Sequence, residues 1–207
     1  MVLYLSSYKL GNRTDELKHY AQTHKKILLI ANSRDHFTDL ERIEKGVSVD
    51  EKQLSELGFE VTRLDLRKFF GKQKDLEKFI AKYNGFYVIG GNTFVLRKAF
   101  ALSGMDNILL SFWSYPNYLY IGYSAGICVL CEDLHGLILV DEPGGDPIWN
   151  GLGYIHPIYL PHYRSDHPES KMVNDCVKYC KAHDLPYETL KDGDVKILNS
   201  HTWKRGS

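Results

Sequence analysis

Short apolar runs recur along the chain between segments in which polar and apolar residues mix. Most of these runs are uniformly apolar, which is typical of strands buried on both faces of a parallel sheet. The segment 59–64 instead alternates between apolar and polar residues, as a half-buried strand does. The pattern predicts strands over 2–6, 26–31, 59–64, 85–89, 119–122, 137–140, 158–160 and 195–198.

The segments between these runs favour helices. Residues 39–57 and 75–83 carry apolar side chains at an approximate helical period, and 14–23 is polar but permits a helix. Two further helices are predicted over 93–101 and 174–182. Because strands alternate with helices, we expect an α/β fold with a mostly parallel central sheet and helices on both faces, in one domain over residues 1–207.

Composition narrows the kinds of partner. Lys+Arg and Asp+Glu both number 26, so the formal net charge is zero, and no basic run or acidic tail occurs. Such a chain lacks the electrostatic attraction that nucleic acid or an anionic membrane requires. The N-terminal apolar run has no basic n-region, and no apolar stretch approaches the ~20 residues of a membrane helix. We therefore expect a cytoplasmic monomer or homodimer without nucleic-acid or membrane partners.

The four cysteines allow two interpretations. Cys128 and Cys131 have the C-x-x-C spacing of redox pairs and of half zinc sites. Their apolar surroundings favour buried packing instead, and the one-turn spacing of Cys176 and Cys180 suits packing as well as ligation. No H-x-x-x-H pattern occurs that would complete a metal set, so we expect no metal site.

The strongest chemical candidate is Ser124, in the segment G-Y-S-A-G at residues 122–126. A serine nucleophile needs a sharp strand-to-helix turn that lifts its hydroxyl toward substrate, with small neighbours that let the elements approach. The backbone N–H of Ala125 can then stabilise an oxyanion. The alternative is a structural turn in which Ser124 caps the following helix.

Two other predicted strands end near chemically useful residues. Gly90 and Gly91 lie between a strand and a helix, where they can supply a second oxyanion donor, cradle a phosphate, or form a structural turn. His162 directly follows the strand 158–160, a position that suits a general base. Active sites of parallel sheets lie at the carboxyl ends of the strands, so we expect these residues to meet Ser124.

The sequence pattern alone does not identify the acidic residue that would orient the histidine. The candidates are Asp141, Asp146, Glu188, Asp192 and Asp194. Most of these carboxylates belong to expected loops, and Asp192 with the glycine after it is also typical of a hairpin turn.

Three segments together resemble the dipeptidase E and cyanophycinase family of serine peptidases. They are G-G-N-T-F at 90–94, G-Y-S-A-G at 122–126 and P-H-Y at 161–163, in the family's order and with similar spacing. The resemblance extends from the first strand to about Val195. It implies a three-layer α/β sandwich related to class I glutamine amidotransferases, and no cofactor. It also implies Ser124 as nucleophile, His162 as base, and the N–H groups of Gly91 and Ala125 as the oxyanion hole.

The chain departs from the family at two places. The family's acid is a glutamate in a Leu-x-Glu-Gly turn, and L-K-D-G at 190–193 lines up with it, so the resemblance implies Asp192 as the triad acid. The aspartyl dipeptidase branch has an Asn-Asp pair between nucleophile and histidine. This chain has His135 and Gly136 in the matching region, so strict aspartyl-dipeptide specificity is not expected.

We therefore predict a serine-type peptidase that hydrolyses short peptides through Ser124, His162 and Asp192. The loops 142–150 and 164–170 are expected to select the substrate, with Asn92 and Arg164 as candidate binding residues. An exposed, solvated arginine is the alternative for Arg164. A small-molecule esterase or amidase with the same triad, and a non-catalytic binding homologue, are the alternatives for the whole chain.

Overall fold

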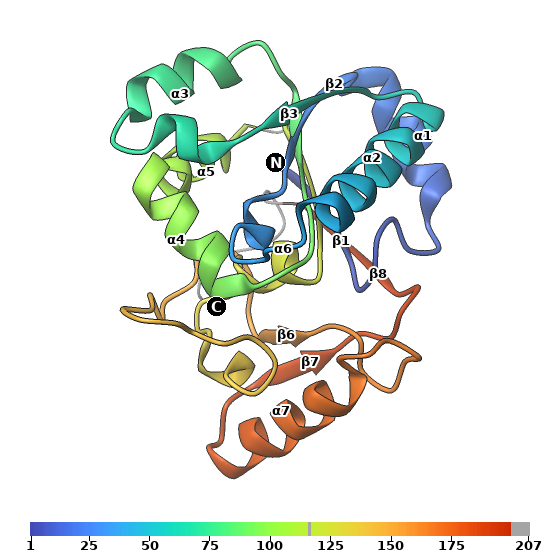
Figure 1. Ribbon diagram of the computed structural model, residues 1–207. Coiled ribbons are helices and arrows are strands. Elements are labelled where there is room, and N and C mark those ends of the chain that lie inside the picture. The colour runs from blue at the N-terminus through green and yellow to red at the C-terminus, as the bar shows by residue number, and fades with distance from the viewer. Residues whose placement is uncertain (116, 200–207) are drawn as a thin grey trace.

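The computed structural model describes residues 1–115 and 117–199, and a six-stranded sheet forms its centre (Figure 1). The strand order is β3-β2-β4-β5-β1-β8, and all neighbouring strands are parallel except β8, which pairs antiparallel with β1. The strands are β1 Val2–Ser6, β2 Lys26–Ile30, β3 Glu60–Leu64, β4 Gly85–Val88, β5 Leu119–Tyr123 and β8 Val195–Asn199.

Helices cover both faces of this sheet, because successive side chains of a strand point to opposite faces and both sets are apolar here. Tyr87 of β4 packs with the apolar sides of α1 and α2, while its neighbour Phe86 packs with those of the helices on the other face. The result is the expected three-layer α/β sandwich. The helices are α1 Thr14–Thr23 and α2 Leu40–Glu56 on one face, and α3 Gln73–Ile80, α4 Thr93–Ser103, α5 Met105–Phe112 and α6 Ala125–Cys128 on the other.

A smaller unit packs beyond the end of the sheet at which α6 begins (Figure 1). Strands β6 (Ile158–Leu160) and β7 (Tyr187–Thr189) form a separate parallel pair, and α7 (Ser170–Ala182) packs beside them. A buried apolar cluster joins Leu160 of β6 and Cys176 of α7 to Cys128 of α6. Because α6 directly follows β5, this cluster brings the end of β6 toward the end of β5.

Most predicted elements are present, and two predictions about local structure are wrong. Residues 137–140 do not form a strand, because the 3-10 helix η3 (His135–Leu137) continues into turns in which Val140 N donates to Leu137 O. Residues 192–193 do not form a β-hairpin, because β7 before them pairs with β6 and β8 after them pairs with β1. An apolar run of four residues and an Asp-Gly pair are both too short to reveal these tertiary partners.

Two elements are not predicted by the sequence pattern. Helix α5 is only eight residues long and mostly apolar, so its sequence resembles that of a buried strand, and β7 is only three half-buried residues long. Two short 3-10 helices follow strands, η1 (Asn32–Arg34) after β2 and η2 (Leu66–Phe69) after β3. Within the described ranges, no helix has both the length and the apolar character needed to cross a bilayer.

Candidate active site

Ser124 lies at the turn between β5 and α6, with φ 50° and ψ −115°. Positive φ is uncommon for a residue other than glycine, and such strain clusters at functional sites. The turn is tight, since a Cβ on Gly122 would come 2.6 Å from the carbonyl oxygen of Gly126. The Ser124 hydroxyl does not cap α6, and it makes no hydrogen bond with any described residue. It is therefore available to react.

The Gly90-Gly91 loop follows β4, the strand next to β5. Gly91 has φ 152°, and a Cβ there would lie 2.6 Å from the carbonyl oxygen of Ser33, so a larger residue does not fit. Ser33 also accepts the N–H of Asn92 at 2.8 Å, which holds the loop in place. In the described part of the chain, the N–H groups of Gly91 and Ala125 have no hydrogen-bond acceptor.

His162 follows β6 and is 2% exposed. Its φ is 63°, so both Ser124 and His162 have backbone conformations that are rare outside glycine. The ring Nδ1 lies 2.7 Å from Oδ1 of Asp192, and the backbone N–H donates to the hydroxyl of Ser7 at 2.9 Å. An N–H at Nδ1 that donates to Asp192 leaves the lone pair of Nε2 free to accept a proton.

Asp192 is itself held by two serines. Its Oδ1 accepts a hydrogen bond from the hydroxyl of Ser7 at 3.0 Å, and its N–H donates to the hydroxyl of Ser165 at 2.9 Å. Ser7 directly follows β1, so the central sheet orients both partners of the His162–Asp192 pair. The sequence analysis does not identify Ser7, although its place after a predicted strand is the same signal that marks His162.

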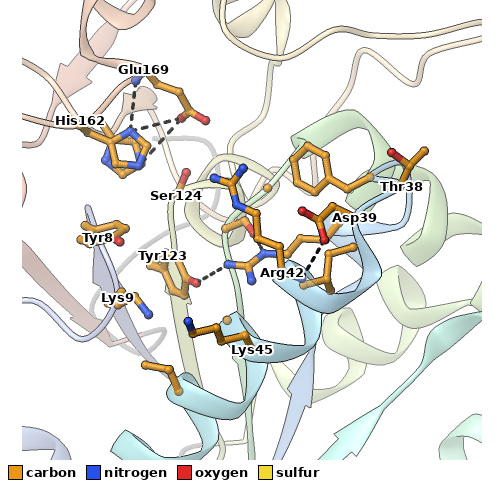
Figure 2. A pocket seen from close by; sticks show the side chains of 18 residues that line it. Tyr8, Lys9, Thr38, Asp39, Arg42, Lys45, Tyr123, Ser124, His162 and Glu169 are labelled. Carbon is orange, nitrogen blue, oxygen red and sulfur yellow. Dashed lines mark hydrogen bonds and ion pairs between the residues drawn. The ribbon is translucent and has the colours of Figure 1, made fainter.

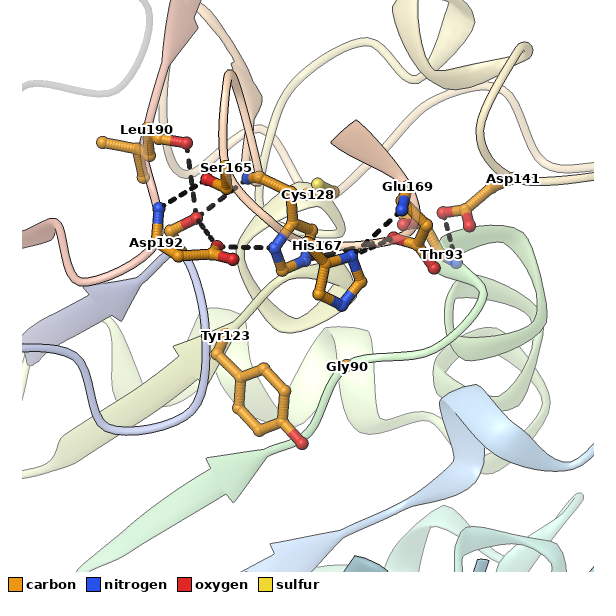
Figure 3. Close-up of polar contacts among 12 residues, drawn as sticks. Gly90, Thr93, Tyr123, Cys128, Asp141, Ser165, His167, Glu169, Leu190 and Asp192 are labelled. Carbon is orange, nitrogen blue, oxygen red and sulfur yellow. Dashed lines mark hydrogen bonds and ion pairs between the residues drawn. The ribbon is translucent and has the colours of Figure 1, made fainter. Parts of the chain in front are cut away.

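The other side of His162 meets the imidazole of His167 and the carboxylate of Glu169. Figure 3 shows these two side chains close together. The ring of His167 stacks on that of His162 with 3.7 Å between centroids, and Glu169 Oε2 lies 4.0 Å from His162 Nε2. Burial, and next the proximity of His167, lower the pKa of His162 below its usual value, although Asp192 opposes this. Burial raises the pKa of the Glu169 carboxyl to about 7. His162 is therefore neutral at neutral pH, as a general base must be.

Ser124 and His162 border the same cavity, which has a volume of about 580 Å³ (Figure 2). This volume lies within the usual range for small-ligand sites. The Gly90-Gly91 loop also lines the cavity, so the three segments that the sequence analysis expects to converge do so. Tyr8, His167 and the side chains of α2 complete the walls.

The structure places the two predicted substrate-binding residues away from the cavity lining. Asn92 caps α4 by accepting the N–H of Val95 at 3.0 Å, and its amide donates to the carbonyl of Glu142 at 2.8 Å. Both the oxygen and the nitrogen of the Asn92 side-chain amide therefore already form hydrogen bonds within the protein. Arg164 is exposed, and its guanidinium carbon lies 5.1 Å from the centroid of the Tyr163 ring.

Metal ligation is geometrically poor at this site. Among the described residues, His162, His167 and Glu169 have ligand atoms within 4.8 Å of one another. The two imidazole planes are only 12° apart and stacked, so their nitrogen lone pairs point along separate, nearly parallel planes. A single ion could meet both only after one ring turned, because a ligand nitrogen binds a metal in the plane of its ring.

A three-layer α/β sandwich with a free serine hydroxyl at a strained strand-to-helix turn defines a hydrolase of the serine class. Comparison with known proteins then identifies the family. The profile of peptidase family S51 matches residues 11–198, and the chain belongs to this family. The protein is therefore a serine-type peptidase.

Individual relatives agree with this assignment. The chain is 28% identical over 166 residues to the uncharacterized peptidase Lin0382 of Listeria innocua serovar 6a, covering 77% of this chain and 78% of the relative. Its fold is similar to that of a candidate peptidase E protein from Listeria monocytogenes EGD-e, with a TM-score of 0.71 at 20% identity over 96% of this chain and 98% of the other. A peptidase from an acI-B1 Actinobacterium gives a TM-score of 0.69 at 17% identity over 96% and 83%. At these identities the two solved structures show the fold alone.

Proposed function

We propose that this serine peptidase hydrolyses short peptides through a triad of Ser124, His162 and Asp192. The observation that carries the proposal is the 2.7 Å contact between His162 Nδ1 and Asp192 Oδ1, on a histidine that shares a cavity with the free hydroxyl of Ser124. Asp192 holds the imidazole in the tautomer with its proton on Nδ1, and stabilises the imidazolium that forms during the reaction.

The reaction follows from these positions. His162 Nε2 takes the proton of the Ser124 hydroxyl as the oxygen attacks the peptide carbonyl. The N–H groups of Gly91 and Ala125 stabilise the oxyanion, and losing one donor of this kind typically costs ~10²–10³ in turnover. His162 then gives its proton to the leaving amine, and water releases the acyl group from Ser124. No hydrogen bond joins Ser124 to His162 in this structure, and such contacts commonly tighten only when substrate binds.

The direct test is hydrolysis of short peptides with free amino termini, bearing N-terminal Asp, Glu, Arg or an apolar residue. We expect the wild-type protein to cleave at least one of these peptides. Ser124→Ala should cleave the same peptide only in trace amounts. The preferred residue would show how far the specificity departs from that of aspartyl dipeptidases. Equal cleavage by both proteins, or none across the panel, would contradict the proposed reaction.

A second variant pair tests the acid. Asp192→Asn keeps the shape of the side chain but no longer favours the productive tautomer, so we expect kcat to fall by roughly 10³–10⁴. Glu188→Gln is the matched control, because Glu188 forms its ion pair with Lys196 at 2.5 Å and has no contact with His162. An unchanged kcat in Asp192→Asn would assign the role of the acid to another residue.

A further inference from the structure

The peptide unit between Gly90 and Gly91 is held by side chains on its carbonyl side. The carbonyl of Gly90 accepts hydrogen bonds from Nε of Arg34 and from the hydroxyl of Ser33, each at 3.0 Å. The N–H of Gly91, a proposed oxyanion donor, belongs to the same peptide unit. Because a trans peptide unit is planar, its C=O and N–H point in opposite directions, and a fixed carbonyl also fixes the direction of the N–H.

Arg34 is the stronger of the two donors to this carbonyl. The Ser33 hydroxyl has a single proton and lies 3.0 Å from the carbonyls of both Ile89 and Gly90, so it donates fully to only one of them. The guanidinium is charged, and hydrogen bonds from a charged donor are stronger than those between neutral groups. The direction of the Gly91 N–H therefore depends mainly on the position of Arg34.

Tyr123, the residue directly before Ser124, fixes the position of Arg34. Nη2 of Arg34 donates to the Tyr123 hydroxyl at 3.0 Å, and the dashed line at Tyr123 in Figure 2 marks this contact. The hydroxyl gives its own proton to Oδ2 of Asp50 at 3.0 Å, so its lone pairs face the arginine. Asp50 is fully buried, and its Oδ1 lies 2.9 Å from the Lys9 ammonium. A buried carboxylate with both oxygens paired anchors the tyrosine.

The Gly90-Gly91 loop also packs directly on the turn that carries Ser124. A Cβ on Gly90 would lie 2.8 Å from Cε2 of Tyr123 and 3.0 Å from Cβ of Ser124. The second proposed oxyanion donor, the N–H of Ala125, belongs to that turn. Hydrogen bonds from Tyr123 through Arg34 to Gly90 thus connect the two halves of the proposed oxyanion hole.

We propose that Arg34 and Tyr123 are positioning residues of the oxyanion hole, which hold the Gly91 N–H in the direction that the transition state requires. Neither side chain needs to touch the substrate for this role. The inference deepens the proposed function and rests on Ser124 being the nucleophile. Because the oxyanion exists only during the reaction, loosening this peptide unit should lower kcat and leave KM unchanged.

The experiment measures how fast and how completely an alkyl fluorophosphonate labels Ser124, by mass spectrometry of the intact protein. The Ser124 oxygen bonds to phosphorus and fluoride leaves, while the phosphoryl oxygen gains negative charge that the oxyanion hole stabilises. The rate therefore reports on the hole, and the final extent counts correctly folded sites. Ser124→Ala shows which labelling belongs to this serine.

Tyr123→Phe keeps the ring that packs on Gly90 but removes the hydroxyl between Asp50 and Arg34. We expect the labelling rate to fall about 10- to 100-fold at full final extent, because a misplacement of about 1 Å can cost ~10² in rate. In peptide hydrolysis, kcat should fall by a similar factor. KM and the pH profile of kcat/KM should not change, since His162 keeps its contacts.

Tyr87→Phe is the matched control. Tyr87 is a buried tyrosine of β4, and its ring centroid lies 5.8 Å from that of Tyr123. Its hydroxyl has no hydrogen-bond partner among the described residues, so its removal breaks no such contact. This variant should be labelled at the wild-type rate.

Arg34→Met tests whether the tyrosine acts through the arginine. Alone, it removes the charged donor to Gly90 and should slow labelling at least as much as Tyr123→Phe. Adding Tyr123→Phe to Arg34→Met should then cause little further loss, because the contact between the two residues is already gone.

Four results would overturn the inference and leave the triad intact. They are an unchanged rate in Tyr123→Phe, a lower final extent without a lower rate, an equal loss in Tyr87→Phe, and losses from Tyr123→Phe and Arg34→Met that simply multiply. Absence of labelling at Ser124 in the wild-type protein would instead contradict the triad, and the inference would fail with it.

Discussion

At the scale of single residues, the protonation of His162 controls the proposed reaction. Its imidazole is buried, stacked on His167 and bonded to Asp192, so opposing effects act on the same proton. Burial and His167 lower the pKa, and Asp192 raises it, with the lowering effects dominant. The ring therefore stays neutral to a lower pH than a free histidine, whose pKa is about 6.5.

This balance predicts the pH dependence of activity. A base with a lowered pKa is active above that pKa and loses activity as the pH falls through it, so kcat/KM should decline only below about pH 6.5. His167→Gln removes an influence that lowers the pKa of His162 and should move this decline to higher pH. Profiles of kcat/KM against pH for both proteins check the direction.

Glu169 supplies the control for that measurement. Its pKa is raised to about 7, and it lies 4.0 Å from His162 Nε2, so its own titration falls near the same range. The profile should therefore also be recorded in Glu169→Gln, which removes the titration of this carboxyl from the site. A decline that stays in place in His167→Gln would contradict the assigned influence of the stacked ring.

At the scale of elements, the close approach of α6 to the sheet positions Ser124. Gly126 lies in α6, and a Cβ there would clash with the carbonyl oxygen of Val88 in β4. Tyr123, just before Ser124, is anchored through its hydroxyl, which donates to buried Asp50 at 3.0 Å and accepts from Arg34. The turn that carries Ser124 is thus held on both sides by contacts from other elements.

Gly126→Ala tests this close packing. The added methyl group has to push α6 away from β4, so we expect a loss of about 1–3 kcal/mol in the free energy of unfolding, together with a loss of turnover. Urea denaturation and peptide hydrolysis measure the two effects. Gly145→Ala is the control for stability, since a Cβ there meets nothing within 4 Å, and it should leave the free energy of unfolding unchanged. Full stability in Gly126→Ala would show that the turn can adjust freely.

At the scale of the whole molecule, the small β6–β7 unit and the central sheet share buried packing that includes cysteines. All four cysteines are free and buried, and burial raises the pKa of Cys131 to about 12 and that of Cys176 and Cys180 to about 11. Cys128, Cys176 and Cys180 lie in the cluster that joins the two parts. Such thiols are protonated at neutral pH and inaccessible to solvent, so they act as apolar packing groups.

Thiol labelling therefore reports the integrity of the assembled molecule. We expect a disulfide reagent at pH 8 to label none of the four thiols quickly in the native protein, and all of them in denaturant. The rate of labelling across a urea series should rise together with unfolding measured by circular dichroism. Rapid labelling of a subset without denaturant would show instead that the β6–β7 unit opens independently of the sheet.

The sequence by itself determines much of the architecture. Apolar runs between helical segments predict the buried strands of a parallel sheet, and all of them except 137–140 form strands. A glycine-bounded serine directly after such a strand lies at the carboxyl edge of the sheet. The motif segments around Gly91, Ser124 and His162 were therefore accessible without a structure. For Gly91 and Ser124, convergence on one cavity follows from the same rule, because β4 and β5 are neighbouring parallel strands whose carboxyl ends share an edge. Strand β6, which precedes His162, belongs to a separate pair, and buried packing against α6 brings its end to the cavity.

Only the tertiary structure decides the remainder. Asp192 contacts His162 across 30 positions, and Ser7 reaches both from the opposite end of the chain. No local pattern separates Asp192 from the other acidic candidates, since each reads as an ordinary loop carboxylate. The place of Arg42 and Lys45 is hidden for the same reason: both look like solvent-exposed residues of an amphipathic helix until the fold places that helix along the cavity that Ser124 also lines. Side chains that meet through long-range packing leave no periodic signal in the sequence.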